Sequence, residues 1–96
     1  MKINFNNENG KLIVDVEGRL DTTTSPEFES FLRDNMDDID EMTINCEKLE
    51  YISSAGLRVL LFAQKKMKDS MKLINVCDSV MEVFEITGFV DVLTIE

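Results

Sequence analysis

Two segments near the start of the chain, residues 2–5 and 11–16, carry apolar side chains at every second position. Such alternation is typical of strands that bury one face and expose the other. The connection between them, residues 6–10, is rich in Asn and ends in Gly. The pattern therefore predicts that the chain begins with a β-hairpin.

The apolar spacing then changes to the period of a helix in three later segments. We expect the first helix to begin near Pro26, since proline suits the first helical position and Thr24 or Ser25 can cap it. The second is expected to follow Ser54, and its apolar residues surround most of its circumference. The third should begin at Asp78 or Ser79 and end at Gly88. We interpret the apolar residues of these helices as core rather than as the lining of a ligand pocket.

Three more strands are expected between and after these helices, around residues 42–46, 73–76 and 90–95. The predicted order is ββαβαβαβ, in one domain that spans residues 1–96. Strands that alternate with helices favour a parallel sheet, and the first hairpin makes it mixed. The sequence predicts an α/β fold with a mostly parallel sheet of about five strands.

The charge of the chain narrows its possible partners. The formal net charge is −9 at pH 7, which disfavours binding to nucleic acid or to anionic lipid. No apolar run approaches the roughly 20 residues that span a bilayer, and the first residues lack a basic-then-apolar signal region. We therefore expect a cytoplasmic protein without membrane insertion, whose partners are neutral or basic proteins.

Residues suited to catalysis are scarce. The chain has no His, so the commonest general base is missing, and neither a nucleophile elbow nor a phosphate-binding loop is present. The acidic run in residues 34–41 is interpreted as solvated surface. Cys46 and Cys77 lack metal-ligand spacing and are expected to be small buried residues at strand ends. The sequence predicts no enzyme, no metal site and no cofactor.

Two adjacent hydroxyls, Ser53 and Ser54, precede the apolar second helix. A serine at this position can cap the helix through its side-chain oxygen. The same helix end is also a favourable seat for a phosphate, because free N–H groups and the positive end of the helix dipole face it. The residues alone leave both readings open.

Ser53-Ser54-Ala55-Gly56-Leu57, preceded by residues 49–52 and by Gly18-Arg19-Leu20-Asp21, resembles the anti-sigma-factor antagonists, the single-domain members of the STAS group. The resemblance covers nearly the whole chain. The family pattern is Asp-Ser-(Ser/Thr/Ala)-Gly-Leu, in which the Ser after the Asp is phosphorylated. Ser54 matches this acceptor and Gly56 matches the Gly, whereas Ser53 stands at the position of the Asp.

This resemblance implies a phosphorylation switch. The unphosphorylated form would bind an anti-sigma factor that is also its Ser kinase, phosphorylation of Ser54 would release it, and a phosphatase would restore binding. Asp21, Ser53, Ser54 and Gly56 are then the expected partner-facing site. Two of them have structural alternatives: Asp21 can cap a turn, and Gly56 can allow close packing.

A second reading of the same resemblance is a STAS subunit that binds a transporter or a signalling assembly constitutively and is never phosphorylated. Ser53 in place of the family Asp favours this reading, whereas Ser54 favours the switch. STAS domains usually carry one more helix after the last predicted strand. We therefore expect part of one sheet face or edge to be exposed or covered by a partner.

Overall fold

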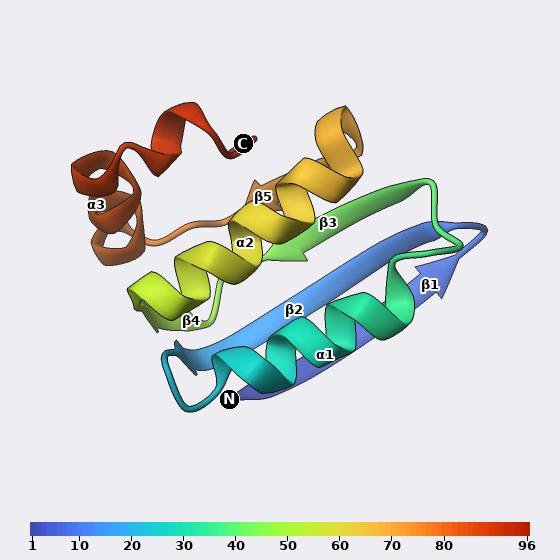
Figure 1. Ribbon diagram of the computed structural model, residues 1–96, viewed down its shortest axis with the longest axis horizontal. Helices are drawn as coiled ribbons and strands as arrows, with labels where there is room; N and C mark the ends of the chain where they lie inside the picture. The colour runs from blue at the N-terminus through green and yellow to red at the C-terminus, as the bar shows by residue number, and fades with distance from the viewer.

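The computed structural model describes residues 1–96 as a mixed sheet with two helices, α1 and α2, side by side on one face (Figure 1). The strands are β1 (Lys2–Glu8), β2 (Lys11–Leu20), β3 (Glu41–Asn45), β4 (Leu49–Ile52) and β5 (Met71–Ile74). The helices are α1 (Ser25–Asn35), α2 (Ser54–Met67) and α3 (Asp78–Thr87), with short 3-10 turns at Lys68–Ser70 and Phe89–Asp91. The expected mixed α/β class with a sheet of five strands is confirmed.

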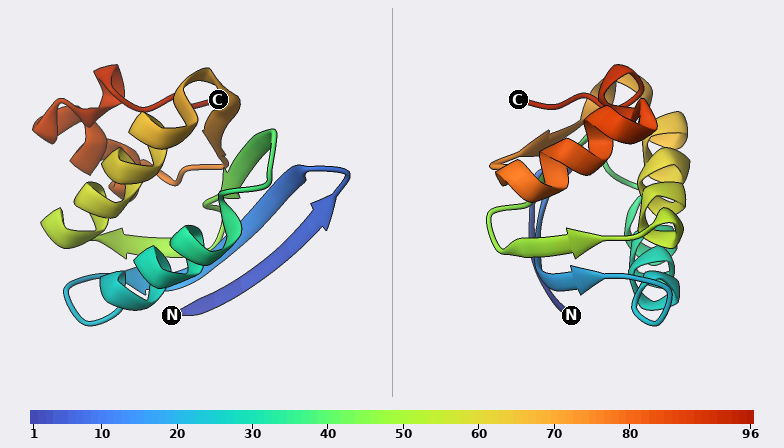
Figure 2. Two further views of the ribbon diagram at one scale, coloured as in Figure 1. Left: turned by 45° about the vertical axis from the view of Figure 1, so that its right-hand side comes forward. Right: turned by 90° about the vertical axis from the view of Figure 1, so that its left-hand side faces the viewer.

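The long strand β2 organises the sheet. The strand order is β1-β2-β3-β5, in which β1 is antiparallel to β2 and the other neighbours are parallel. The first half of β2 pairs with β3, and its last residues pair with β4, with an irregularity in the register between Gly18 and Arg19. The right-hand view of Figure 2 shows β2 and β4 running side by side in the same direction, each toward the start of a helix.

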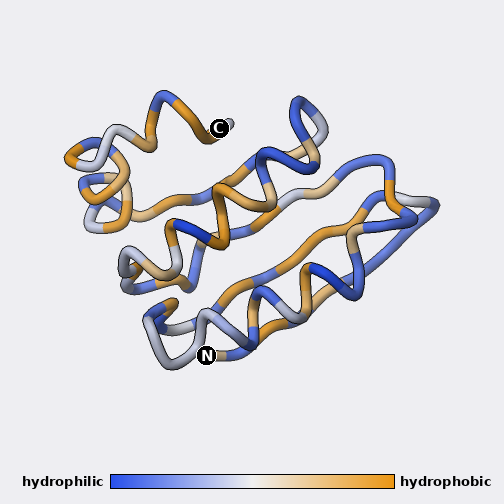
Figure 3. Tube along the Cα trace, in the orientation of Figure 1, coloured by the Kyte–Doolittle hydropathy of each residue, from blue (hydrophilic) through white to orange (hydrophobic).

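The core lies between the sheet and the helices. Leu12, Val14 and Val16 of β2 are buried and alternate with exposed residues, as the period-two pattern predicts. The largest fully buried side chains of the helices are Phe28 of α1 and Phe84 of α3, the second of these in the helix that packs against β4. Hydrophilic residues gather instead at the β1–β2 turn and in the segment before β3 (Figure 3). None of the helices combines the length and the apolar character that crossing a membrane requires.

The strand β4 is absent from the predicted order. Its burial pattern explains the omission, because Leu49 and Ile52 are buried while the two residues between them are exposed. Apolar residues three positions apart do not produce the period-two signal of a half-buried strand. The pairing of β4 with β2 is itself irregular, because the register shifts between Gly18 and Arg19.

The predicted closing strand at residues 90–95 is wrong except at one position. Gly88 ends α3 as expected, with a φ of 80°, but a 3-10 turn follows it. The N–H groups of Val92 and Leu93 bond back to the carbonyl of Phe89, so this segment satisfies its polar groups locally. Only Ile95 bridges to β5. The observed order is therefore ββαββαβα rather than ββαβαβαβ.

Candidate functional site

The residues predicted to form the site come together where β2 and β4 end. A hydrogen bond from the Ser53 N–H to the carbonyl of Leu20, at 2.9 Å, joins the two strand ends. The chain leaves β2 through the turn at residues 21–24 into α1, and leaves β4 directly into α2. The carboxyl ends of parallel strands are a common place for binding sites in α/β folds. Asp21 and the Ser53–Ser54 pair thus belong to one end of the molecule.

Ser54 is the first residue of α2, and its side chain is exposed. Ser53 is the N-cap residue, yet its hydroxyl caps nothing: Oγ is buried and has no hydrogen-bond partner. The first turn of α2 contains no acidic residue. Because the first N–H groups of a helix lack intrahelical acceptors, a negative group on Ser54 would meet N–H donors and the positive end of the dipole.

Gly56 is buried beneath these serines. A Cβ built on Gly56 would lie 2.8 Å from the Leu20 carbonyl oxygen, 2.8 Å from Leu20 Cγ and 2.8 Å from Ile52 Cγ1. Side chains rarely tolerate such distances, and here one of the neighbours is backbone. The geometry favours the close-packing alternative, in which Gly56 lets α2 begin directly against β2 and β4.

Asp21 caps the turn before α1. Its Oδ1 accepts hydrogen bonds from the N–H groups of Thr23, at 3.0 Å, and Thr24, at 3.2 Å. The Thr24 hydroxyl donates to the Arg19 carbonyl at 2.8 Å and accepts from the Asp21 N–H at 2.9 Å. The bond from the Thr24 N–H is the main cause that lowers the pKa of the Asp21 carboxyl. The carboxylate is half-buried and remains part of the surface near Ser54.

Two arginines near this end were not singled out as site residues in the sequence. Arg19 Nε lies 3.7 Å from Asp21 Oδ2, and its guanidinium carbon lies 4.1 Å from the centre of the Tyr51 ring. Arg58 is exposed and lines a shallow groove of about 240 Å³ between the starts of α1 and α2. The signal for Arg58 was its position four residues after Ser54, which places both on one face of the helix. The site therefore contains two arginines, of which only Arg19 forms an ion pair.

Comparison with known protein families identifies the family of the chain. The model of the STAS domain matches residues 2–96. The chain belongs to the STAS domain family. The sequence-based recognition is confirmed.

Individual relatives agree with this assignment. BtrV of Bordetella bronchiseptica, named provisionally as an anti-sigma factor antagonist, is 30% identical over 99% of this chain and 85% of its own length. The anti-sigma-B factor antagonist of Staphylococcus aureus is 32% identical over 83% of this chain and 78% of its own length. The fold resembles a crystal structure from Thermotoga maritima, also named provisionally as an anti-sigma factor antagonist, with a TM-score of 0.87 and 16% identity. That alignment covers 97% of this chain and 84% of the other.

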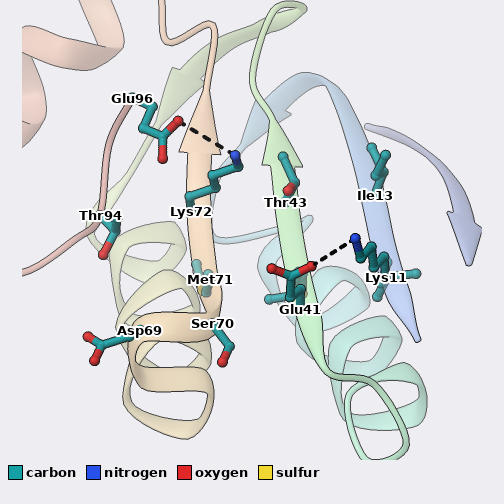
Figure 4. Close-up of a pocket in the computed structure, with 12 residues that line it drawn as sticks. Lys11, Ile13, Glu41, Thr43, Asp69, Ser70, Met71, Lys72, Thr94 and Glu96 are labelled. Atoms are coloured by element: carbon teal, nitrogen blue, oxygen red, sulfur yellow. Dashed lines mark ion pairs between the residues drawn. The ribbon is translucent and has the colours of Figure 1, made fainter. Parts of the chain in front are cut away.

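The largest hollow of this STAS domain lies away from Ser54, on the sheet face opposite α1 and α2. Figure 4 shows this hollow of about 400 Å³ between the residues that β2, β3 and β5 point outward. Its two lysines are engaged, Lys11 with Glu41 at 3.7 Å and Lys72 with Glu96 at 3.5 Å (Figure 4). No group of three or more potential metal ligands lies together in the chain. Both lysines of the hollow are therefore paired, and Asp69 at its edge forms no ion pair.

The two cysteines differ more than the sequence suggested. Cys46 is buried after β3 as expected, and burial raises the pKa of its thiol to about 12. Cys77 is only half-buried and stands at the start of α3, so the expectation of a second buried cysteine at a strand end is wrong. Interaction with the Ser79 hydroxyl, followed by the Val80 N–H, lowers the pKa of the Cys77 thiol.

Proposed function

We propose that this STAS domain is an anti-sigma factor antagonist whose binding to an anti-sigma factor is switched by phosphorylation of Ser54. The observation that carries the proposal is the exposed Ser54 hydroxyl at the start of α2, beside a buried Ser53 hydroxyl and a buried Gly56. The names of the relatives from Bordetella bronchiseptica and Staphylococcus aureus support the same role. The protein acts as a regulatory binding protein rather than an enzyme.

The residues of the site have different parts in this proposal. Asp21, in the turn before α1, and Ser54, the first residue of α2, face the partner. Ser53 and Gly56 hold the start of α2 against β2 and β4, through the Ser53 N–H and the missing Cβ of Gly56. The proposed partners are an anti-sigma factor that is also the Ser kinase and a phosphatase that restores Ser54, all in the cytoplasm.

The energetics of a phosphate explain how binding is lost without unfolding. Phosphorylation adds about −1.5 to −2 charges and three acceptor oxygens. Within the domain, the helix dipole and the absence of acidic residues in the first turn of α2 favour this charge. Across an interface, the same charge must lose water without a prepared partner, which costs on the order of several kcal/mol. Modification therefore acts on the complex rather than on the fold.

The test compares wild type, phosphorylated protein and Ser54→Asp for binding to the cognate anti-sigma factor, by calorimetry at one salt concentration. We expect Ser54→Asp to weaken binding at least about tenfold, which corresponds to ~1.4 kcal/mol, with an unchanged melting temperature. Ser70→Asp is the matched control, because Ser70 is exposed beyond the other end of α2. Equal affinities for all forms would reject the switch and leave a constitutive STAS subunit.

Mapping the modified residue is the second test. After incubation with the kinase and ATP, mass spectrometry should find phosphate on Ser54 and not on Ser53, whose hydroxyl is buried. Phosphate on Ser53, or on neither serine with the true kinase present, contradicts the proposal.

A further inference from the structure

Arg58 is a free cation beside the proposed acceptor. It is exposed, forms no ion pair and donates no hydrogen bond within the chain. The other two arginines are both engaged. Arg19 lies beside Asp21 and over the Tyr51 ring, and Arg33 pairs with Glu29 at 3.1 Å.

The helix geometry directs Arg58 toward Ser54. Residues four apart lie on one face of an α-helix, with Cβ atoms roughly 5–6 Å apart. Helical side chains also lean toward the helix N-terminus, so a long side chain covers the turn that precedes it. Ser54 occupies that turn, and both side chains are exposed, so no buried contact holds the guanidinium away from the Ser54 side chain.

The acidic residues nearby do not compete strongly for Arg58. The Asp21 carboxylate already forms an ion pair with Arg19 and accepts hydrogen bonds from two backbone N–H groups. Glu29, which lines the same groove from α1, is paired with Arg33. No acidic residue stands in the first turn of α2. A dianion on Ser54 would therefore be the strongest unpaired partner within reach of Arg58.

We propose that Arg58 is the intramolecular counter-ion of a phosphate on Ser54, a claim that rests on the proposed function and assigns its regulation to a further residue. Arginine suits the role because its planar guanidinium donates two parallel hydrogen bonds to a phosphate. The phosphate is then held from two sides, by the N-terminal N–H groups of α2 and by Arg58. This pairing stabilises the folded state of the modified domain. It also neutralises the charge of Arg58 within the molecule.

The test uses protein in which phosphoserine is placed at residue 54 during translation, so that no kinase is needed. Phosphorus NMR follows the titration of the phosphate in the phosphorylated wild type, Arg58→Gln and Lys65→Gln. Lys65→Gln removes the same charge from an exposed residue in the last turn of the same helix. We expect Arg58→Gln to raise the titration midpoint by about 0.3 unit or more, because a neighbouring cation favours the dianion, and Lys65→Gln to change it by less than about 0.1 unit.

Arg58→Lys separates charge from geometry. It should keep the midpoint near that of wild type because the charge is retained. The hydrogen-bonded guanidinium N–H signal of Arg58 should appear downfield in the phosphorylated wild type and be absent from the unphosphorylated wild type. The unphosphorylated Arg58→Gln protein should melt like wild type, because Arg58 has no partner there. An equal midpoint in wild type and Arg58→Gln overturns the counter-ion. A kinase that ignores Ser54, or a partner that binds the phosphorylated form equally well, would instead overturn the proposed function.

Discussion

The starts of α1 and α2 lie side by side at the ends of β2 and β4, but they are built in opposite ways. At α1, the side chains of Asp21, Thr24 and Ser25 all form hydrogen bonds with nearby backbone groups. At α2, the Ser53 hydroxyl has no partner and the Ser54 hydroxyl forms no hydrogen bond within the chain. Departures from good local structure concentrate at functional sites. The contrast indicates that the start of α1 serves stability, whereas the start of α2 remains available for another group.

The largest expected effect at the start of α2 comes from Gly56→Ala. Helix propensity alone predicts that this change stabilises α2 by up to about 1 kcal/mol. The contacts predict the opposite, because the new methyl would lie 2.8 Å from the Leu20 carbonyl oxygen and from two side-chain carbons. Overpacking of this kind costs typically ~1–3 kcal/mol, so we expect a net loss of about 2 kcal/mol in the free energy of unfolding. Chemical denaturation measures it.

Gly88→Ala is the control for this change. Nothing lies within 4 Å of a Cβ built on Gly88, and only its φ of 80° opposes a side chain. The cost should therefore be about 1 kcal/mol from the left-handed backbone alone. A Gly56→Ala protein as stable as wild type would show that α2 can shift away from β2, and the packing role of Gly56 would be lost.

Thr24→Ala tests how much the side-chain hydrogen bonds at the start of α1 contribute to stability. The Thr24 hydroxyl joins the end of β2 to the turn through its bonds to the Arg19 carbonyl and the Asp21 N–H. A hydrogen bond of this kind contributes about 1 kcal/mol, and we expect a loss of that size. Thr22→Ala is the matched control, because Thr22 is exposed in the same turn and its hydroxyl forms no hydrogen bond. Equal stability of the two variants would remove the contrast between the helix starts.

The difference between the starts of α1 and α2 can be predicted only in part from the sequence. The hairpin and the start of α2 follow from local signals, namely alternation in β2 and two serines before an apolar run. The role of Gly56 does not, because it depends on Leu20 and Ile52, which approach it only after β2 and β4 have paired. The sequence alone therefore supports both the packing role and the partner-facing role of Gly56.

The other differences between the predicted and the observed structure also have local causes, which the hydrophobic pattern of the sequence does not reveal. The strand β4 has the wrong apolar spacing, and the segment after Gly88 bonds to itself instead of extending along β5. The orphaned hydroxyl of Ser53 is invisible in the sequence, where a serine before a helix predicts a cap. Site residues could therefore be named from the sequence, but their division into exposed and packed groups required the fold.

The pH dependence of stability should distinguish Asp21 from an ordinary surface carboxylate. Its pKa is lowered from 3.8, so the folded state favours the ionised form. The stability that ionised Asp21 contributes is present above this value and is lost as the pH falls through the lowered pKa of the folded state. Asp21→Asn should therefore melt below wild type at neutral pH and approach it in acid.

Asp38→Asn is the control for Asp21, since Asp38 is exposed and forms no ion pair. Its melting temperature should differ little from that of wild type across the same pH range. If Asp21→Asn keeps a constant difference from wild type down to about pH 2, well below an ordinary carboxyl pKa, the turn depends on shape rather than on charge.

The smallest expected effect belongs to Ser53→Ala, and its sign is the sharpest test of the comparison. Replacing a capping serine with alanine typically costs ~1 kcal/mol. The Ser53 hydroxyl, however, is buried without a partner and makes no capping bond. Removing an unsatisfied buried hydroxyl ends its desolvation penalty, so we expect a change between zero and a gain of about 1 kcal/mol. The backbone bond from Ser53 to Leu20 is untouched by the substitution, and α2 should begin at the same residue. Chemical denaturation should compare Ser53→Ala with Thr24→Ala. If Ser53→Ala lowers the free energy of unfolding as much as Thr24→Ala does, the side chains at both helix starts stabilise the fold alike, and the start of α2 is not specially available to another group.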